Sequence, residues 1–270
     1  MICGTGAIRS KIDLRDYKIS AAGANELPDM YACENLPRVK NQGGVSSCVA
    51  HATSSILEYF DGTYGVSHEL STNFIYGLEK KVCGHDGKGM YLRNACKIVK
   101  EYGTPVETLC KGNTEVPHVY EIAEPCLDNI AVTGNAYHFS IDAYFDCKGQ
   151  DAIKKAIYNY GPVLACVKWY KDFKVKEGLL SSSLKGDYGW HAVMLYGWDD
   201  AGWLMQNSWG SSWGNKGRAI IPYHFPITEV KALIDSEMDI DKSDLIIPKR
   251  NKFLDIVYHI INWILNLFRK

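Results

Sequence analysis

A cysteine and a histidine that stand far apart constrain the fold of this chain most strongly. Cys48 follows a short run that contains Gln42 and two glycines, and His191 stands 143 positions later. Asn207 follows the histidine after 16 further positions. A histidine can activate a thiol, and a third polar group can orient its ring, only when folding brings the three together. The pattern therefore predicts a fold that joins two distant parts of the chain around one thiol.

The residues after Cys48 predict the helix that carries it. Apolar residues recur at helical spacing from Ser47 to Phe60, and two glycines precede them. Cys48 would lie in the first turn, where unpaired backbone N–H groups and the helix dipole favour a negative charge. A protonated His191 would stabilise the thiolate further. The side-chain amide of Gln42 and the Cys48 N–H would together stabilise an oxyanion.

Several separated motifs resemble those of the papain family of cysteine peptidases, in the family's order. The motifs surround the cysteine, the histidine and the asparagine, and they comprise Gln42, Gly43, Ser47, Cys48, Ala50, His191, Ala192, Val193, Asn207, Ser208, Trp209, Gly210, Trp213, Gly214 and Gly217. The resemblance covers residues 27–235, and the predicted catalytic domain comprises residues 27–236. It implies an α+β fold of two lobes, with the Cys48 helix in a helical left lobe and His191 and Asn207 in a β-sheet or barrel right lobe.

The resemblance also implies a role for each matching position. Cys48 would be the nucleophile, His191 the acid and base, Asn207 the group that orients the histidine, and Gln42 the oxyanion donor. Positions that would contact substrate are Gly87 and Gly89 in one wall of the cleft, Cys166 and Ala192 in a side-chain pocket, and Trp209 over the His191–Asn207 pair. Core packing explains Cys166 and Ala192 equally well. Neither a metal nor a cofactor is expected.

Some positions depart from the family pattern. Val49 stands where the family has tryptophan, His51 where it has phenylalanine, and Trp190 where plant members have aspartate. The extra cysteine that usually precedes the nucleophile is also missing. These departures look more like Cys-poor bacterial or phage members, so a substrate preference cannot be transferred. We expect His51 to be structural, because it replaces a packed aromatic residue.

Three functions fit these residues. The first is an endopeptidase that cleaves polypeptides through a thioester acyl-enzyme. The second is a binding or scaffold protein with altered or no catalysis, and the third is an amidase or transamidase acting on a non-protein substrate. A net charge of −1 with 23% charged residues gives no sign of a nucleic-acid partner. Retention of all four catalytic residue types favours the peptidase.

The nine cysteines bear on metal binding and on the cellular compartment. Their number is odd and no Cys-x-x-Cys pair occurs, which argues against a zinc site. The first residues show no signal-peptide pattern, so free thiols in a reducing, cytoplasmic or membrane-associated setting are the simpler expectation. An oxidised pair of Cys110 and Cys126 stays open as an alternative.

The segment before Cys48 has only 47 residues, about half the length of the prodomains in the resembled family. We therefore expect no inhibition by such a domain. Residues 1–26 are predicted to be a lead-in, with Ile12 to Tyr17 packing on the catalytic domain in an extended form.

Periodicity and turn residues predict the other elements of the domain. Helices are expected over 91–102 and 151–160, and strands over 163–169, 191–197, 203–207, 218–223 and 230–234. A turn at 199–202 would join two of these strands and bring His191 close to Asn207.

The last part of the chain differs from the resembled family. Residues 237–252 are predicted to be an acidic and then basic linker. A calcium loop is not favoured there, because Ile240 and Ile246 occupy the places where such a loop needs Gly and Glu.

Residues 253–270 predict an apolar amphipathic helix with one narrow polar face. Its apolar part would be about 24 Å long, too short for a hydrocarbon core of about 30 Å. It would lie at a membrane surface, dock on a partner or second copy, or fold back on the domain.

Overall fold

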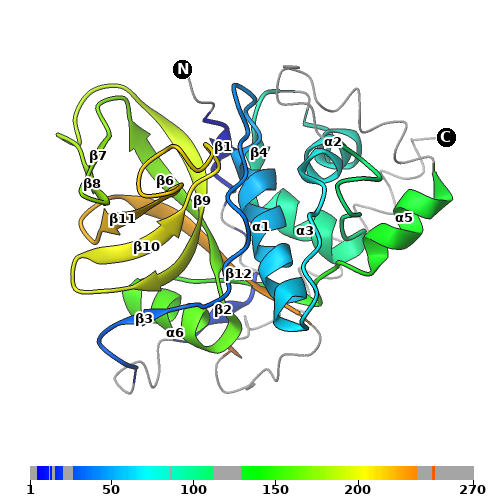
Figure 1. The fold of residues 1–270 in the computed structure, drawn as a ribbon, viewed down its shortest axis with the longest axis horizontal. Coiled ribbons are helices and arrows are strands. Elements are labelled where there is room, and N and C mark those ends of the chain that lie inside the picture. Colours follow the sequence, from blue (N-terminus) through cyan, green and yellow to red (C-terminus); the bar gives the residue numbers. More distant parts are fainter. Residues whose placement is uncertain are drawn as a thin grey trace, which may run out of the picture.

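The computed structural model describes residues 5–11, 13, 16–20, 27–85, 87–111, 129–235 and 245–246. These residues form two lobes, one helical and one built on a sheet, as the sequence predicts (Figure 1). The C-terminal helix predicted over 253–270 lies outside the described residues, and the linker predicted over 237–252 is described only at 245–246. No described helix is long and apolar enough to cross a membrane.

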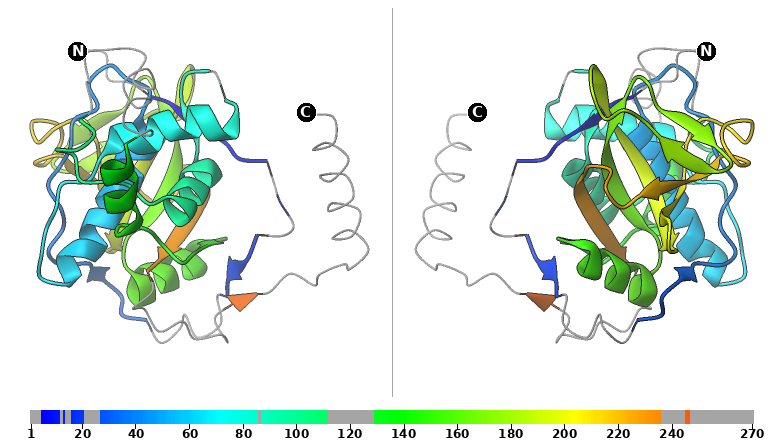
Figure 2. Two further views of the ribbon diagram at one scale, coloured as in Figure 1. Left: turned by 90° about the vertical axis from the view of Figure 1, so that its right-hand side faces the viewer. Right: turned by 90° about the vertical axis from the view of Figure 1, so that its left-hand side faces the viewer.

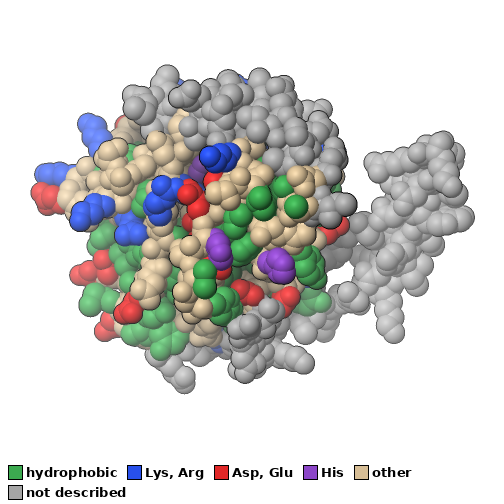
Figure 3. Space-filling model, turned by 45° about the vertical axis from the view of Figure 1, so that its right-hand side comes forward, with side chains coloured by type: hydrophobic (Ala, Val, Ile, Leu, Met, Phe, Trp, Pro, Cys, Tyr) green, Lys and Arg blue, Asp and Glu red, His purple; other side chains and the backbone are tan. Residues whose placement is uncertain are grey.

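The helical lobe is built around one buried helix. It contains α1 (Cys48–Thr63), α2 (Thr72–Cys83), α3 (Leu92–Glu101) and α5 (Ile130–Tyr137). α1 contacts α2 and α3 on one side and strands of the second lobe on the other, so it is buried along most of its length. This position between the lobes explains why α1 buries residues on nearly every face, including the polar residues His51, Ser54 and Glu58. Hydrophobic side chains remain scattered over the outside of this lobe (Figure 3).

The second lobe is a long, mostly antiparallel sheet with one helix, α6 (Gln150–Tyr160), packed against it. Its strands are β3 (Tyr31–Ala32), β5 (Ala143–Asp146), β6 (Val163–Tyr170), β7 (Lys174–Lys176), β8 (Leu179–Ser181), β9 (Tyr188–Trp198), β10 (Gly202–Gln206), β11 (Arg218–Pro222) and β12 (Ile227–Ile234). The central order is β5-β12-β6-β9-β10-β11-β8-β7, and β3 pairs with β9. The two lobes have separate cores, and Cys48 belongs to the core of the helical lobe.

Strand register brings the predicted site residues together. β6 pairs with β9 so that Cys166 lies opposite Ala192, next to His191. β9 and β10 form the predicted hairpin, with Trp198 opposite Trp203, and Asn207 follows directly after β10. The histidine and the asparagine therefore lie at the same end of neighbouring strands.

The N-terminal segment forms two short strands. β1 (Ala7–Ile8) runs parallel to β4 (Met90–Tyr91), which lies just before α3. β2 (Lys18–Ile19) lies between β5 and β13 (Leu245–Ile246), at the end of the large sheet. The two N-terminal strands lie at opposite ends of one side of the molecule (Figure 2). The lead-in is therefore part of the fold and contacts both lobes.

Candidate active site

Cys48 is the first residue of α1, as the sequence predicts. Ser47 precedes it as the N-cap, but its hydroxyl makes no capping bond and lies 3.2 Å from the Nδ1 atom of His51. The Cys48 thiol is fully buried and accepts a hydrogen bond from the Ala192 N–H at 3.4 Å. The helix terminus therefore points at the sulfur, with its backbone N–H groups and positive dipole end.

His191 and Asn207 form a short buried pair. The Nε2 atom of His191 lies 2.7 Å from the Oδ1 atom of Asn207, which also accepts the Ser208 backbone N–H at 2.8 Å. Because that oxygen can only accept, Nε2 of His191 must carry the proton, and the neutral ring has its lone pair on Nδ1. Within the described part of the chain, Nδ1 is buried and has no hydrogen-bond partner. The ring is thus held in the tautomer that can take a proton from a thiol.

Two tryptophans contact the histidine, and a third packs against them. Trp209 stacks on the ring of His191 at 4.6 Å between centroids, and Trp169 meets that ring edge-on at 5.0 Å. Trp213 packs edge-on against Trp209 at 5.5 Å. The predicted place of Trp209, over the His191–Asn207 pair, agrees with this geometry. Trp169 is missing from the sequence-based site, although the apolar run of the predicted strand 163–169 was a signal that the strand is buried.

Gln42 is buried, and both polar atoms of its side-chain amide form hydrogen bonds. Its Nε2 atom donates to the Val45 carbonyl at 2.7 Å, and its Oε1 atom accepts from the Ser208 hydroxyl at 2.6 Å. The Gln42 backbone N–H also donates to the Ser208 carbonyl at 2.8 Å. The loop before α1 is therefore fastened to the segment that carries Asn207. Ser208 had no specific role in the sequence analysis.

The four other residues predicted to contact substrate differ in exposure: Cys166, Ala192 and Gly89 are buried, and Gly87 is exposed. Ala192 and Cys166 lie side by side on adjacent strands, and both are almost completely buried. Gly89 is buried and lies against the N-terminal segment, since a Cβ atom there would be 2.3 Å from the Gly6 carbonyl oxygen. Gly87 is exposed, and the side chain nearest to it is His85.

The N-terminal segment covers the thiol. Backbone groups of Gly6 and Ala192 both hydrogen-bond to Cys48, and the Gly6 carbonyl accepts the Met90 N–H at 2.8 Å. The sequence predicted that the lead-in packs on the domain, but it placed no residue of the lead-in at the thiol. Gly6 is therefore a site residue that the sequence analysis missed.

Burial sets the protonation states of the pair. Burial raises the pKa of the Cys48 thiol to about 11, although backbone hydrogen bonds oppose the shift. Burial lowers the pKa of His191 to about 4, and the bond to Asn207 opposes that shift. At neutral pH both groups are uncharged in this structure. The thiolate–imidazolium pair expected from the sequence is therefore disfavoured while the site is covered.

His51 makes contacts within its own helix, as a structural residue would. Its Nδ1 atom lies 3.0 Å from the Ser47 carbonyl oxygen, and burial lowers its pKa to about 4. No described hydrogen bond joins His51 to Cys48 or Asn207. This geometry favours His191 over His51 as the partner of the thiol.

The other cysteines agree only in part with the reducing environment expected from the sequence. Cys33, Cys83, Cys96, Cys147 and Cys166 are free thiols, and only Cys83 among them is exposed. Cys110, however, takes part in a disulfide bond. Cys126, its suggested partner, lies outside the described residues. The described residues contain no group of three or more His, Cys, Asp or Glu side chains arranged to hold a metal ion.

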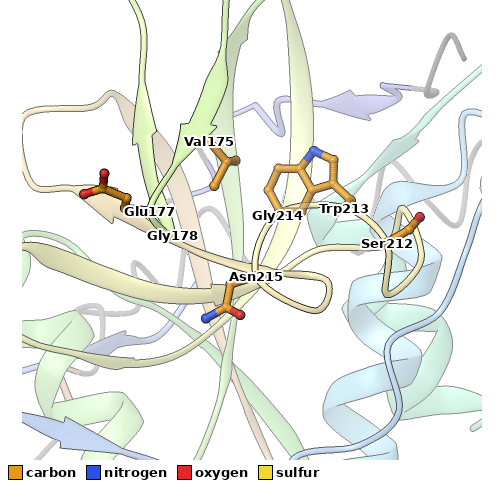
Figure 4. A pocket seen from close by; sticks show the side chains of 7 residues that line it. All are labelled: Val175, Glu177, Gly178, Ser212, Trp213, Gly214 and Asn215. Atoms are coloured by element: carbon orange, nitrogen blue, oxygen red, sulfur yellow. The ribbon is translucent and has the colours of Figure 1, made fainter.

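A polar cavity of about 570 Å³ opens beside the tryptophans. It is lined by Val175, Glu177, Gly178, Ser212, Trp213, Gly214 and Asn215 (Figure 4). The Trp213 indole forms one side of the cavity and contacts Trp209, which stacks on His191. The indole rings of Trp213 and Trp209 therefore lie between the cavity and the ring of His191.

Comparison with known proteins agrees with this geometry. The profile of the papain family cysteine proteases matches residues 28–224. The chain belongs to the papain family. Cathepsin B-like cysteine proteinase 1 of Haemonchus contortus is 30% identical to this papain-family chain over 223 residues, which cover 80% of the chain and 60% of the relative. Cathepsin B-like cysteine proteinase 3 of Caenorhabditis elegans is 26% identical over 215 residues, which cover 68% of the chain and 57% of the relative.

The chain thus spans about three fifths of the length of these curated relatives. Among solved structures, xylellain, a cysteine protease from Xylella fastidiosa, has a TM-score of 0.74 at 21% identity. The similarity covers 86% of this chain and 96% of xylellain, and at that identity it shows a shared fold. The resemblance to the papain family seen in the sequence is confirmed. The expected closeness to Cys-poor bacterial or phage members stays a prediction.

Proposed function

We propose that the protein is a cysteine endopeptidase that hydrolyses polypeptides, with Cys48 as nucleophile, His191 as acid and base, and Asn207 as the group that orients His191. The observation that carries this proposal is the fixed tautomer of His191. Its Nε2–H bond to Asn207 leaves the lone pair on Nδ1, in a ring buried in the same site as Cys48. A ring in this tautomer can accept the thiol proton on Nδ1 without first changing tautomer.

The reaction would proceed in two stages. The Sγ proton of Cys48 moves to Nδ1 of His191, and the thiolate attacks the scissile carbonyl carbon to form a C–S bond. The Cys48 N–H and the Gln42 amide stabilise the oxyanion. When the C–N bond breaks, His191 gives its proton to the leaving amine. Water then attacks the thioester and loses a proton to His191; the C–S bond breaks, and the proton returns to sulfur as the carboxylic acid leaves.

The positions of Cys166, Ala192, Gly89 and Trp209 support a substrate cleft between the lobes. Cys166 and Ala192 lie beside the thiol from the sheet lobe, and Gly89 approaches from the helical lobe. A polypeptide bound in extended form would contact both walls.

Digestion of an unfolded protein tests the proposal. Denatured casein is incubated with the wild-type chain, with Cys48→Ala and with Cys147→Ala, and the fragments are identified by mass spectrometry. Cys147 is a buried cysteine in the sheet lobe, so its variant controls for the loss of a buried thiol. We expect cleavage within the chain by the wild type and by Cys147→Ala, and none by Cys48→Ala. Undiminished cleavage by Cys48→Ala would contradict the assigned nucleophile.

A further inference from the structure

A second thiol lies beside Cys48, on the sheet lobe. Cys166 belongs to β6 and is directly opposite Ala192 of β9, whose backbone N–H donates to the Cys48 sulfur at 3.4 Å. Residues that lie directly opposite each other on antiparallel strands have their side chains on the same face of the sheet. Cys166 and Ala192 therefore share one face, at the point where the sheet meets the thiol.

The two cores of the molecule show which lobe this face contacts. Cys166 and Ala192 belong to the core of the helical lobe, as does Cys48. The residues that follow them along the strands, Val167 and Val193, belong to the core of the sheet lobe. α1 packs against both β6 and β9, with Cα atoms within 8 Å. The Cys166 side chain is therefore directed away from the sheet-lobe core and toward the helix that begins with Cys48.

The charge state of Cys166 depends on that of Cys48. Cys166 is a fully buried free thiol. Burial raises its pKa to about 12; a side-chain hydrogen bond with Thr228 opposes this shift, and the charge of a Cys48 thiolate adds to it. Because a charge on one sulfur acts on the other, the two thiols belong to one site. Cys166 keeps its proton at neutral pH, and it stays a thiol while Cys48 reacts.

Peptide hydrolysis does not require a second thiol. No described hydrogen bond joins Cys166 to His191 or Asn207, so Cys166 takes no part in the proton transfers. As a wall of the substrate pocket, the position needs only a small side chain. A sulfur atom beside the nucleophile adds redox chemistry that neither packing nor hydrolysis uses.

We propose that Cys48 and Cys166 form a reversible disulfide when hydrogen peroxide enters the active site, and that Cys166 thereby protects the nucleophile from irreversible oxidation. This inference rests on the proposed function in one respect, because the same thiolate of Cys48 starts both reactions. The disulfide blocks peptide hydrolysis until a thiol reductant restores both cysteines.

The oxidation has two steps. The Cys48 thiolate attacks one oxygen of hydrogen peroxide; an S–O bond forms, the O–O bond breaks, and the leaving hydroxide takes up a proton to become water. Cys166 then attacks the sulfur of this sulfenic acid; an S–S bond forms, the S–O bond breaks, and the Cys166 proton leaves with the hydroxide as a second water. Two thiols are oxidised and one peroxide is reduced. Without Cys166, a second peroxide oxidises the sulfenic acid to sulfinic acid, which thiols do not reduce.

Mass spectrometry of the oxidised protein tests the pairing independently of peptide hydrolysis. The full chain is treated with excess hydrogen peroxide at neutral pH, and the remaining thiols are blocked before or after reduction with dithiothreitol. Peptides are analysed for the Cys48–Cys166 cross-link and for Cys48 sulfinic acid. The readout is the ratio of these two products, so the slow reaction of a buried thiol does not affect it.

The variants remove one buried sulfur at a time. Cys166→Ala and Cys166→Ser remove the proposed partner, and two substitutions provide a variant that folds if one of them does not. Cys147→Ala and Cys96→Ala are matched controls, because Cys147 is buried in the sheet-lobe core and Cys96 in the helical-lobe core. Thermal unfolding of every variant checks that it is folded.

We expect the cross-link to be the main product at Cys48 in the wild type and in both controls. Sulfinic acid should be at least about tenfold more abundant in the Cys166 variants. Dithiothreitol should return reduced Cys48 in the wild type but not in these variants.

Three results for the wild type would overturn the proposal: Cys48 stays reduced, it pairs with a cysteine other than Cys166, or it reaches the sulfinic acid as readily as in Cys166→Ala. A Cys48–Cys166 cross-link in a protein that does not cleave casein would leave the disulfide proposal intact and contradict the proposed peptidase. Casein cleavage without the cross-link would do the reverse.

Discussion

Burial decides the charge of Cys48 and His191 more strongly than the features that favour ionisation. The helix terminus and the Asn207 bond favour the charged forms of the thiol and the ring, respectively. Yet burial moves the pKa of Cys48 up to about 11 and that of His191 down to about 4. The residues alone therefore do not make a reactive pair, because their state depends on whether water reaches them.

This dependence predicts a pH profile for alkylation. In the covered site, the thiol loses its proton only near pH 11 and the imidazole gains one only near pH 4, so both stay neutral between these values. Wild-type Cys48 should react slowly from pH 5 to 9 and faster only toward pH 11. In Gly6→Val, the added side chain would clash with the Ser46 carbonyl oxygen and displace the backbone that hydrogen-bonds to Cys48. Water would then reach the site, and an ion pair should give appreciable reaction near neutral pH. Rates measured across pH 5–10 check this, and a neutral plateau in the wild type would contradict it.

The tautomer fixed by Asn207 gives a second prediction at this scale. Asn207→Ala should lower kcat for a peptide substrate by about a hundredfold, because the His191 ring is no longer held in its productive orientation. KM should change little, since Asn207 is buried. His51→Phe should keep its activity per folded molecule. Steady-state kinetics of the three proteins decide between His191 and His51, and an inactive His51→Phe would favour the latter.

At the scale of helices and strands, strongly periodic segments were predicted well. α3, α6, β6 and the β9–β10 hairpin lie within a few residues of their predicted ranges. α5 was missed because its sequence contains a glycine and β-branched residues with weak helix propensity. Its start is marked by Asn129, whose side chain accepts the Ala131 N–H. Such a short helix depends on capping and packing, which periodicity does not report.

The contact of the N-terminal segment with Cys48 was missed for a different physical reason. Gly6 contacts the thiol through its backbone, and a backbone contact leaves no side-chain pattern in the sequence. β1 and β2 have two residues each and depend on partners far away in the chain. By contrast, Cys48, His191 and Asn207 were recognisable because their side-chain chemistry is specific. The sequence thus indicated which groups react, and the structure was needed to find what covers them.

The end of α3 provides a stability prediction. Gly103 follows that helix with a φ of +69°, and a Cβ atom there would lie 1.9 Å from the Ala136 carbonyl oxygen of α5. Gly103→Ala should lower the free energy of unfolding by about 2–4 kcal/mol, from backbone strain and overpacking. Gly134→Ala, in open space within α5, should raise it by about 0.5–1 kcal/mol. Denaturant unfolding of both variants measures the difference, and equal stabilities would contradict the packing of α3 on α5.

At the scale of the whole molecule, a charged network joins the lobes. Lys231 is buried among Asp16, Asp146 and Glu229, and Arg93 adds a second cation from the helical lobe. Buried ion pairs add little stability compared with apolar contacts, but removal of one partner leaves uncompensated charge. The network therefore makes the relative position of the lobes depend on complete charge pairing.

Replacement of the central cation tests this dependence. Lys231→Met should lower the free energy of unfolding by about 3–5 kcal/mol, since three carboxylates lose a shared partner. Lys171→Met, which breaks an exposed pair with Asp187, should change it by less than about 1 kcal/mol. Denaturant unfolding at neutral pH measures both. If the two variants were equally stable, the network would have no role in holding the lobes together.

The place of β2 in the sheet has one more consequence. Among the described strands, β13 pairs only with β2, and β2 also covers the outer side of β5. When β2 leaves, β5 becomes an edge strand with unpaired N–H and C=O groups, and β13 loses its neighbour. A molecule from which β2 is released would therefore present a template for strand addition by another chain. Self-association should accompany that release, and it should not depend on cleavage.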